Sequence, residues 1–212
     1  MSQQLVTTDT DERPWRPRVV RDTPPIDLAR AEAAATELLL ALGQPSDNPH
    51  LADTPRRMAQ AFADMLTVGD FELTTFPNSE GYDELVLVQD IPVRSVCEHH
   101  MLPFVGVAHV GYLPAGRILG LSKFARIVQF FSHRPQTQER LTQQIAEHLY
   151  GALSPRGVGV VVEAEHTCMT LRGVRAVGAR TVTSALLGTL RDDPASRAEF
   201  LSLTRSGKRG PA

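Results

Sequence analysis

The chain is poor in cysteine, in excess charge and in long apolar runs. It has two cysteines in 212 residues and a net charge of −2, from 22 basic and 24 acidic side chains. It lacks the run of about 20 apolar residues that a membrane span needs, and residues 1–25 lack the apolar stretch of a signal peptide. The near-neutral charge gives no reason to expect nucleic acid or an anionic membrane as a partner.

The scarcity of cysteine also bears on redox chemistry. Without a signal peptide or a membrane span we expect a cytoplasmic protein, in which thiols stay reduced. The two cysteines could form one disulfide, but metal binding or catalysis is the commoner use of cysteine in that compartment. A content of 42% hydrophobic and 22% charged residues is ordinary for a globular domain.

The sequence of the first 70 residues predicts a flexible arm followed by a helical region. Residues 1–25 have no hydrophobic periodicity, which is typical of a flexible arm. Residues 26–70 contain two segments with apolar residues at helical spacing, residues 27–43 and 54–66. Thr54 is the predicted N-cap of the second helix, with Pro55 at its first helical position.

Residues 71–205 predict one further domain, and residues 206–212 a flexible tail. Alternation with a period of two predicts strands over residues 85–88, 92–96, 104–112, 157–168 and 180–187. One helix is predicted with Ser122 as its cap and another from about Gln136, and a short helix over 194–203 closes the domain. The first of these helices has an apolar face made of Phe124, Ile127, Val128 and Phe131. Strands, two helices and strands again indicate an α+β fold with the helices on one face of an antiparallel sheet.

Two short clusters, CEHH at residues 97–100 and HTC at residues 166–168, hold both cysteines and three of the seven histidines. Thiolate and imidazole are ligands that Zn²⁺ prefers. His166 and Cys168 are two apart in a predicted strand, so we expect both on the same sheet face. On this interpretation the clusters form a zinc site with a fourth position open to water and three protein ligands: Cys97, His100 and Cys168. By spacing alone, His99 or His166 could replace one of them.

The alternative is that the cysteines are ordinary buried thiols and the histidines are hydrogen-bonded core residues. That interpretation is the better one for a single cysteine or histidine. Two clusters that together contain every cysteine of the chain favour the metal site instead.

Between the clusters lie residues suited to a charged, polar ligand. Lys123 and Arg126 are neighbours on one helix face in the first turn, where backbone N–H groups also favour an anion, and Arg172 could join them. Gln138 and Glu139 place an amide beside a carboxylate, a pair that can read the N–H groups of a guanine edge. Taken singly, each feature is better explained as a solvated basic face or an acidic first helical turn.

These features lie within three longer runs of sequence, which follow one another along the chain. The runs are SVCEHHMLPFVGVAHVGYLP, GLSKFARIVQFFSHRPQTQERLTQQIA and EAEHTCMTLRGV. Together they resemble type I GTP cyclohydrolase, over about residues 28–203. The chain departs from the family at Ala179, where a serine usually begins a Ser-x-Thr-x-Thr strand, and alanine cannot make the side-chain hydrogen bond of that serine.

The resemblance implies the tunnelling fold, in which the antiparallel sheets of several subunits join into a barrel. It also implies a homodecamer of two pentamers with active sites where subunits meet. The implied reaction converts GTP to 7,8-dihydroneopterin triphosphate and formate, the first step toward tetrahydrofolate and other pterins. Residues 71–205 would then be the zinc-dependent catalytic domain.

The resemblance further implies a role for each candidate residue. Cys97, His100 and Cys168 correspond to the zinc ligands, and His99 and His166 to the acid/base residues. Ser122 corresponds to a ribose-handling position, Gln138 and Glu139 to the guanine-reading pair, and Lys123, Arg126 and Arg172 to the triphosphate-binding cations.

Chemistry agrees with that assignment, because a zinc-bound water is a nucleophile near neutral pH and an imidazole such as His166 can protonate purine N7. There are three alternatives, and the arrangement of two cysteines and one histidine speaks against the first two. A pterin synthase of the same fold would bind zinc with three histidines, and a nitrile reductase would use a nucleophilic cysteine. A regulatory paralogue would bind zinc and GTP without turnover.

Overall fold

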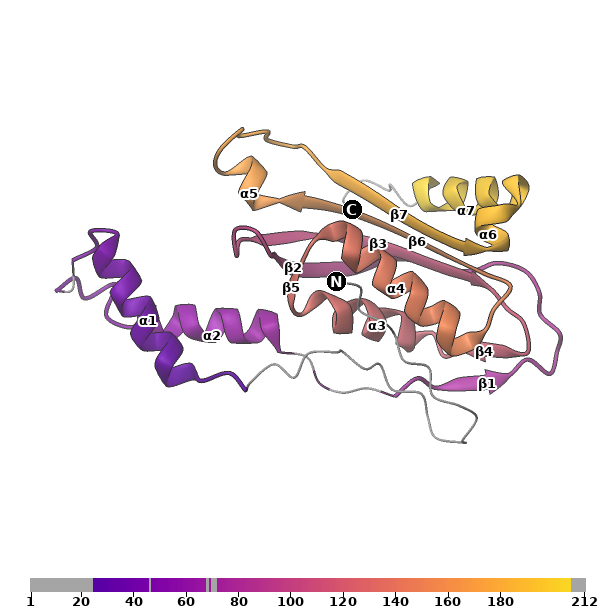
Figure 1. Ribbon diagram of the computed structural model, residues 1–212, viewed down its shortest axis with the longest axis horizontal. Helices are drawn as coiled ribbons and strands as arrows, with labels where there is room; N and C mark the ends of the chain where they lie inside the picture. The colour runs from indigo at the N-terminus through magenta and orange to yellow at the C-terminus, as the bar shows by residue number, and fades with distance from the viewer. Residues whose placement is uncertain (1–24, 46, 68, 70–71, 207–212) are drawn as a thin grey trace, which may run out of the picture. The chain divides into compact units, whose positions relative to one another are not determined.

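The computed structural model describes residues 25–45, 47–67, 69 and 72–206, which form two compact units, one up to residue 67 and one from residue 69 (Figure 1). The predicted arm (except residue 25) and the predicted tail (except residue 206) lie outside the described residues. No helix in the described part of the chain is both long and apolar enough to cross a membrane.

The N-terminal unit contains helices α1, Leu28–Ala41, and α2, Thr54–Leu66. Asp27 caps α1 by accepting a hydrogen bond from the Arg30 N–H at 3.0 Å. The predicted N-cap of α2 was wrong by one residue. Asp53 is the cap and its carbonyl accepts from the Arg57 N–H at 3.0 Å, so Thr54 is already helical. Pro55 is still within the first turn, where a missing N–H costs nothing.

The C-terminal unit is built on a five-stranded sheet in the order β5-β2-β3-β6-β7. Its strands are β2 (Val86–Cys97), β3 (Pro103–Leu113), β5 (Pro135–Gln136), β6 (Gly157–His166) and β7 (Thr181–Gly188). All neighbours are antiparallel except β2 and β5. A separate two-stranded sheet pairs β1, Thr75–Pro77, with β4, Arg117–Leu119. The predicted α+β class with an antiparallel sheet is confirmed.

The two strands predicted over residues 85–88 and 92–96 are one long strand, β2. The register shifts between Val88 and Ile91, where Asp90 has a φ of 53° and donates its N–H to Nδ1 of His109 at 3.3 Å. This is a bulge, which absorbs an extra residue without ending the strand. Pro92 is tolerated because β5 pairs only with the last two residues of β2, leaving one side of the strand free at Pro92.

Helices α3, Ser122–Ser132, and α4, Gln138–Leu153, cover one face of this sheet (Figure 1). The predicted apolar face of α3 is confirmed, since all four of its residues are buried: Phe124, Ile127, Val128 and Phe131. The predicted cap of α3 was wrong, because Leu121 holds that position and Ser122 begins the helix without a capping bond. The start of the next helix also shifts, because Gln136 belongs to β5 and Thr137 caps α4.

A second, smaller core lies on the opposite face, beneath α6, Thr189–Asp192, and α7, Pro194–Ser206. Alternate residues of β6 point to the two cores, so Val160 contacts the first core and Val161 the second. Phe200 of α7 is fully buried, and its ring would lie 2.7 Å from a Cβ at Gly159, so glycine is required there. The sequence had predicted helices on one face only, and these two helices add a partial cover on the other.

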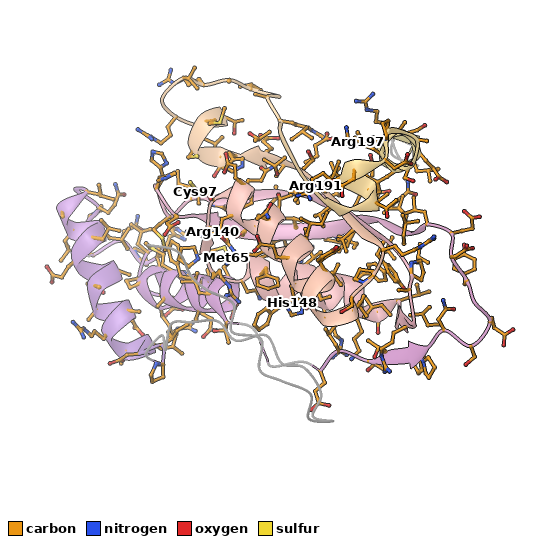
Figure 2. All side chains as sticks on the ribbon, turned by 45° about the vertical axis from the view of Figure 1, so that its right-hand side comes forward. Met65, Cys97, Arg140, His148, Arg191 and Arg197 are labelled. Carbon is orange, nitrogen blue, oxygen red and sulfur yellow. The ribbon has the colours of Figure 1, made fainter. Side chains whose placement is uncertain are left out.

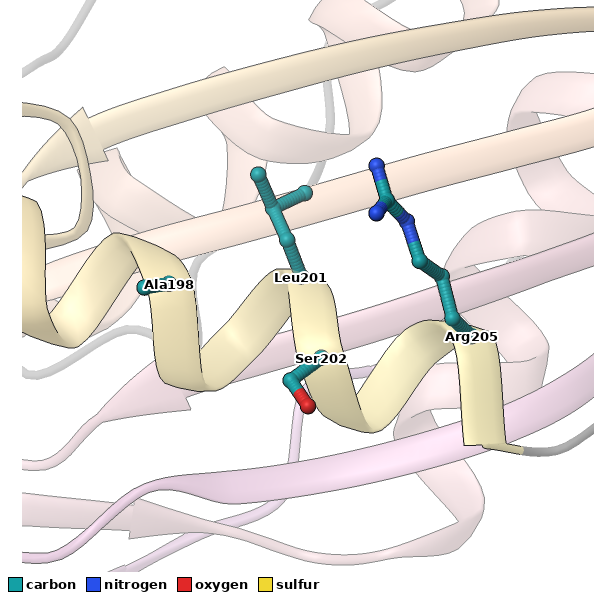
Figure 3. A pocket seen from close by; sticks show the side chains of 4 residues that line it. All are labelled: Ala198, Leu201, Ser202 and Arg205. Carbon is teal, nitrogen blue, oxygen red and sulfur yellow. The ribbon is translucent and has the colours of Figure 1, made fainter.

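A hollow on α7 is lined by Ala198, Leu201, Ser202 and Arg205 (Figure 3). Leu201 and Arg205 project to the same side of the helix there. None of the residues that the sequence nominates for function lines this hollow.

Burial of His148 on α4 predicts a loss of stability in acid (Figure 2). The side chain is 1% exposed, and burial lowers its pKa to about 3, from an ordinary value of 6.5. Below pH 6.5 the unfolded chain takes up a proton at this ring, whereas the folded chain does not until about pH 3. Between pH 6.5 and pH 5 we therefore expect His148 to lower the free energy of unfolding by about 1–2 kcal/mol.

Chemical denaturation at the two pH values, on wild type and on His148→Leu, measures this effect. The variant should lose that part of the pH dependence, and His50→Gln, which replaces an exposed ring, should keep it. Equal pH dependence in wild type and His148→Leu would contradict the prediction.

Candidate metal centre and active site

The fold brings three of the nominated residues to one point. Cys97 is the last residue of β2 (Figure 2), His100 lies in the turn that follows, and Cys168 lies in the short helix α5, Thr167–Thr170. Sγ of Cys97 is 3.9 Å from Nδ1 of His100 and 4.0 Å from Sγ of Cys168, and the three ligand atoms lie within 4.8 Å of one another. A tetrahedral Zn²⁺, with bonds of about 2.3 Å to sulfur and 2.0 Å to nitrogen, separates its ligand atoms by roughly 3.5–3.8 Å. The three residues therefore fit a metal ion.

A tight turn explains why Cys97 and His100 converge. The Cys97 carbonyl accepts hydrogen bonds from the N–H groups of His100, at 3.4 Å, and Met101, at 2.8 Å. Met101 has a φ of 54°, a left-handed conformation that costs an ordinary side chain about 1–2 kcal/mol. The fold thus holds a strained turn next to the ligands, as is common at functional sites.

Cys168 reaches the centre by a different route from the one predicted. β6 ends at His166 and α5 begins at Thr167, so His166 and Cys168 do not share a sheet face through strand alternation. The side chain of Thr167 donates to the Pro103 carbonyl at 2.6 Å, which ties the turn to β3. Cys168 still lies beside Cys97, but the predicted strand geometry was wrong.

The closeness of the two sulfur atoms affects the ionisation of the Cys168 thiol. Burial, followed by the neighbouring Cys97, raises the pKa of the Cys168 thiol above its ordinary value. A divalent cation held by Cys97 and Cys168 would reverse that effect, because metal coordination stabilises the thiolate form. The donor set of two sulfurs and one imidazole nitrogen suits zinc better than magnesium or calcium, which prefer oxygen.

The two remaining histidines of the clusters differ in environment. The ring of His166 stacks on Phe104 of β3, with centroids 4.5 Å apart and planes inclined by 12°, and its Nε2 is 2.8 Å from Oε1 of Gln138. Burial lowers the pKa of His166, and the charge of Glu139 partly opposes that shift. His99 is exposed, with its ring centroid 6.4 Å from that of His100.

Arg140 holds the ligand-bearing turn from outside, and sequence reasoning missed it. Its Nη2 is 2.6 Å from Oε2 of Glu98, and its Nε donates to Oε1 of Gln136 at 2.8 Å. The N–H of Glu98 donates to the Gln136 carbonyl at 3.0 Å, so α4, β5 and the turn are linked. Glu98 and Arg140 are 42 residues apart, and no local pattern predicts their pairing.

Breaking this link is expected to weaken metal binding more than stability. In Arg140→Gln, we expect zinc affinity to fall about tenfold, because groups that orient metal ligands have effects of that size. The free energy of unfolding should change by less than about 1 kcal/mol, because the ion pair is partly exposed. Competition with a chromogenic chelator gives the affinity. Arg191→Gln, which breaks the exposed pair of Arg191 with Asp192, is the matched control. Equal affinity in both variants would show that Arg140 does not position the turn.

Comparison with known proteins decides the family. Residues 31–205 match the family model described as GTP cyclohydrolase I. The chain belongs to the GTP cyclohydrolase I family. It is 54% identical over 187 residues to GTP cyclohydrolase 1 of Mycolicibacterium gilvum, covering 85% of this chain and 92% of the relative. It is 58% identical over 184 residues to GTP cyclohydrolase 1 of Mycobacteroides abscessus, covering 84% of this chain and 89% of the relative.

Membership of the GTP cyclohydrolase I family agrees with the predicted tunnelling fold, whose sheet and helices the chain contains. Three of the positions predicted from the GTP cyclohydrolase resemblance, however, are not beside the candidate metal ligands. Ser122, Lys123 and Arg126 lie at the start of α3, just after β4 (Figure 1). The Leu119 N–H of β4 donates to the hydroxyl of Tyr112, which pairs with the first residue of β2, whereas Cys97 is the last. Within a single chain, these two parts of the predicted site therefore lie apart.

The other positions nominated by the GTP cyclohydrolase resemblance lie nearer the metal ligands. Arg172 is exposed just after α5, and its charge acts on the Cys168 thiol. Glu139 is exposed in the first turn of α4, whereas the adjacent Gln138 is 2% exposed. The side-chain amide of Gln138 is engaged within the protein, with its nitrogen facing β6 and β7 and its oxygen facing His166. Ala179 lies in the loop before β7 and donates its N–H to the Ala176 carbonyl.

Proposed function

We propose that this chain is a zinc-dependent GTP cyclohydrolase I that converts GTP to 7,8-dihydroneopterin triphosphate and formate in the cytoplasm, toward tetrahydrofolate. The observation that carries the proposal is the approach of Cys97, His100 and Cys168 to within 4.8 Å of one another, with His166 held two residues before Cys168. Family membership and the names of the relatives support the substrate.

Cys97, His100 and Cys168 would hold the metal and leave a fourth position open. Zn²⁺ in such a site lowers the pKa of a coordinated water to about 7 and so supplies a nucleophile at neutral pH. A closed structural site would need a fourth protein ligand. Among the described residues, the group that can hold a metal contains three.

The acid/base work falls to the imidazoles. Protonation of purine N7 by His166 makes C8 electrophilic, and addition of water there followed by cleavage of the C8–N9 bond opens the ring. A second water releases formate. The ribose then opens, rearranges by an Amadori-type shift and closes onto the amine with loss of one water. His99 and Ser122 are the groups proposed for the proton transfers at the ribose.

Substrate recognition is proposed to use residues that do not react. Glu139, exposed in the first turn of α4, accepts the N–H donors of the guanine edge, as predicted for the Gln138–Glu139 pair. Lys123, Arg126 and Arg172 bind the triphosphate, which supplies binding energy and orientation.

The assembly is part of the proposal. Because the start of α3 lies far from the metal ligands of the same chain, we propose that Ser122, Lys123 and Arg126 reach the site of a neighbouring subunit. The homodecamer implied by the family resemblance provides such neighbours. Sedimentation analysis, together with mixing of a Lys123→Ala subunit with a Cys168→Ala subunit, tests this arrangement. Recovery of activity in the mixture supports shared sites, and no recovery in a mixed oligomer opposes them.

Incubation of the purified protein with GTP tests the activity itself. We expect release of formate and a product that becomes a fluorescent pterin on oxidation, with loss of both after chelation and recovery with Zn²⁺. Retention of unchanged GTP by zinc-loaded protein would favour the regulatory paralogue instead. Full activity after complete removal of zinc would refute the proposed mechanism.

A further inference from the structure

Gln138 is buried at the start of α4 with a full set of hydrogen bonds inside the protein. Its Nε2 lies 3.0 Å from the Val162 carbonyl, 2.9 Å from the Thr181 carbonyl and 3.2 Å from Oγ1 of Thr183. Its Oε1 lies 2.8 Å from Nε2 of His166. The residue is 2% exposed, so none of these partners is exchanged for bulk water.

The surroundings determine which way the amide points. Backbone carbonyls can only accept hydrogen bonds, so the group that faces Val162 and Thr181 has to be the NH₂ group. The neighbouring hydroxyls agree with this orientation. The hydroxyl of Thr142 donates to the main-chain carbonyl of Gln138 at 2.7 Å. In the 2.6 Å contact between the hydroxyls of Thr142 and Thr183, Thr183 is therefore the donor, and its oxygen can still accept a hydrogen bond from the Gln138 amide.

The amide orientation in turn determines the state of His166. A carboxamide oxygen can only accept, so a neutral imidazole 2.8 Å away must carry its proton on Nε2. The ring cannot turn easily, because it is stacked on Phe104, its cross-strand partner, and Phe104 is fully buried. Within the described residues, Nδ1 of His166 has no hydrogen-bond partner.

We propose that Gln138 is a positioning residue that fixes neutral His166 as the Nε2–H tautomer and leaves Nδ1 as the nitrogen at which His166 gains the proton that it donates to purine N7. This inference rests on the proposed function for the role of His166. It differs from the guanine-reading role predicted for the Gln138 side chain, because a side chain that contacts guanine would have to give up these internal bonds. Glu139 keeps the guanine-reading role.

The tautomer can be measured on the wild-type zinc-loaded protein without GTP. Solid-state ¹⁵N NMR of protein labelled at the imidazole nitrogens distinguishes a protonated from an unprotonated ring nitrogen. His166→Ala assigns the signal by difference among the seven histidines. We expect neutral His166 to be protonated at Nε2. Protonation at Nδ1 would overturn the proposal, whether or not the protein turns over GTP.

Kinetics of Gln138→Met, a change of similar volume that removes both hydrogen-bonding groups, supply the second test. We expect kcat for formate release to fall about 10- to 100-fold with KM and zinc content unchanged, as for a misplaced catalytic group. Gln143→Met, on the exposed face of the same helix, should match wild type. Added to His166→Ala, the Gln138 change should lower kcat no further, because the group that it positions is absent.

The two proposals can fail separately. A raised KM for Gln138→Met with unchanged kcat would identify a guanine contact and overturn the positioning role while leaving the cyclohydrolase activity intact. A further fall in kcat in the double variant would also overturn it. If the wild-type protein releases no formate from GTP, the proposed function fails, and the NMR measurement still decides the tautomer.

Discussion

Cys168→Ala is expected to lose its metal and, with it, nearly all formate release from GTP. Removing one of three protein ligands should weaken zinc binding by more than about 100-fold, since groups that only orient ligands already have effects of 10- to 100-fold. Without the metal, no nucleophile is available near neutral pH, so we expect turnover to fall by at least about 1,000-fold. Metal analysis after gel filtration and a coupled formate assay measure the two quantities.

Met169→Ala is the matched control, because Met169 is the next residue of α5 and is 38% exposed. It should retain both metal and activity. The fold of Cys168→Ala should persist, since its side chain lies at the edge of the core and is only partly buried. A Cys168→Ala protein with one zinc per chain and wild-type turnover would eliminate the proposed ligand set.

His166→Ala is expected to keep its metal and still lose most of its activity. The proposed ligand set contains Cys97, His100 and Cys168, so removal of the His166 ring should leave the metal in place. Loss of a general acid typically lowers turnover by about 10²–10⁴, and we expect formate release to fall within that range. Zinc content and formate release, measured on the same preparation, separate this variant from Cys168→Ala.

Glu165→Gln provides a control on the same strand, because the side chain before His166 points to the other face of the sheet. Its formate release should stay close to that of wild type. Formate release by His166→Ala at near wild-type rate, with normal zinc, would show that the proton carrier is another group.

Much of the fold follows from local pattern. The apolar stripe of α3 is visible because Phe124, Ile127, Val128 and Phe131 recur at helical spacing, and all four are buried. The long strand β3 is visible from its alternation. Helix starts were less accurate, since Asp53 and Leu121 hold the positions predicted for Thr54 and Ser122. Cap identity depends on where the preceding chain enters the helix, which the residue types alone do not specify.

The candidate metal ligands could be named from residue type because few side chains bind zinc and this chain has only two cysteines. The backbone geometry that brings them together could not be predicted. The turn from β6 into α5 depends on the hydrogen bond of Thr167 to Pro103, 64 residues away along the chain. The strand predicted through Cys168 was wrong for this reason, although Cys168 does lie beside Cys97.

Residue chemistry alone therefore nominated side chains for metal binding, proton transfer and phosphate contact. Tertiary structure decided which of them lie close together. It brought Cys168 to Cys97, paired Arg140 with Glu98, and turned the Gln138 amide toward His166. It also placed Lys123 and Arg126 away from the metal ligands of their own chain. The physical reason is that ligand type is a property of each side chain, whereas distance and hydrogen-bond direction depend on residues that are far apart in sequence.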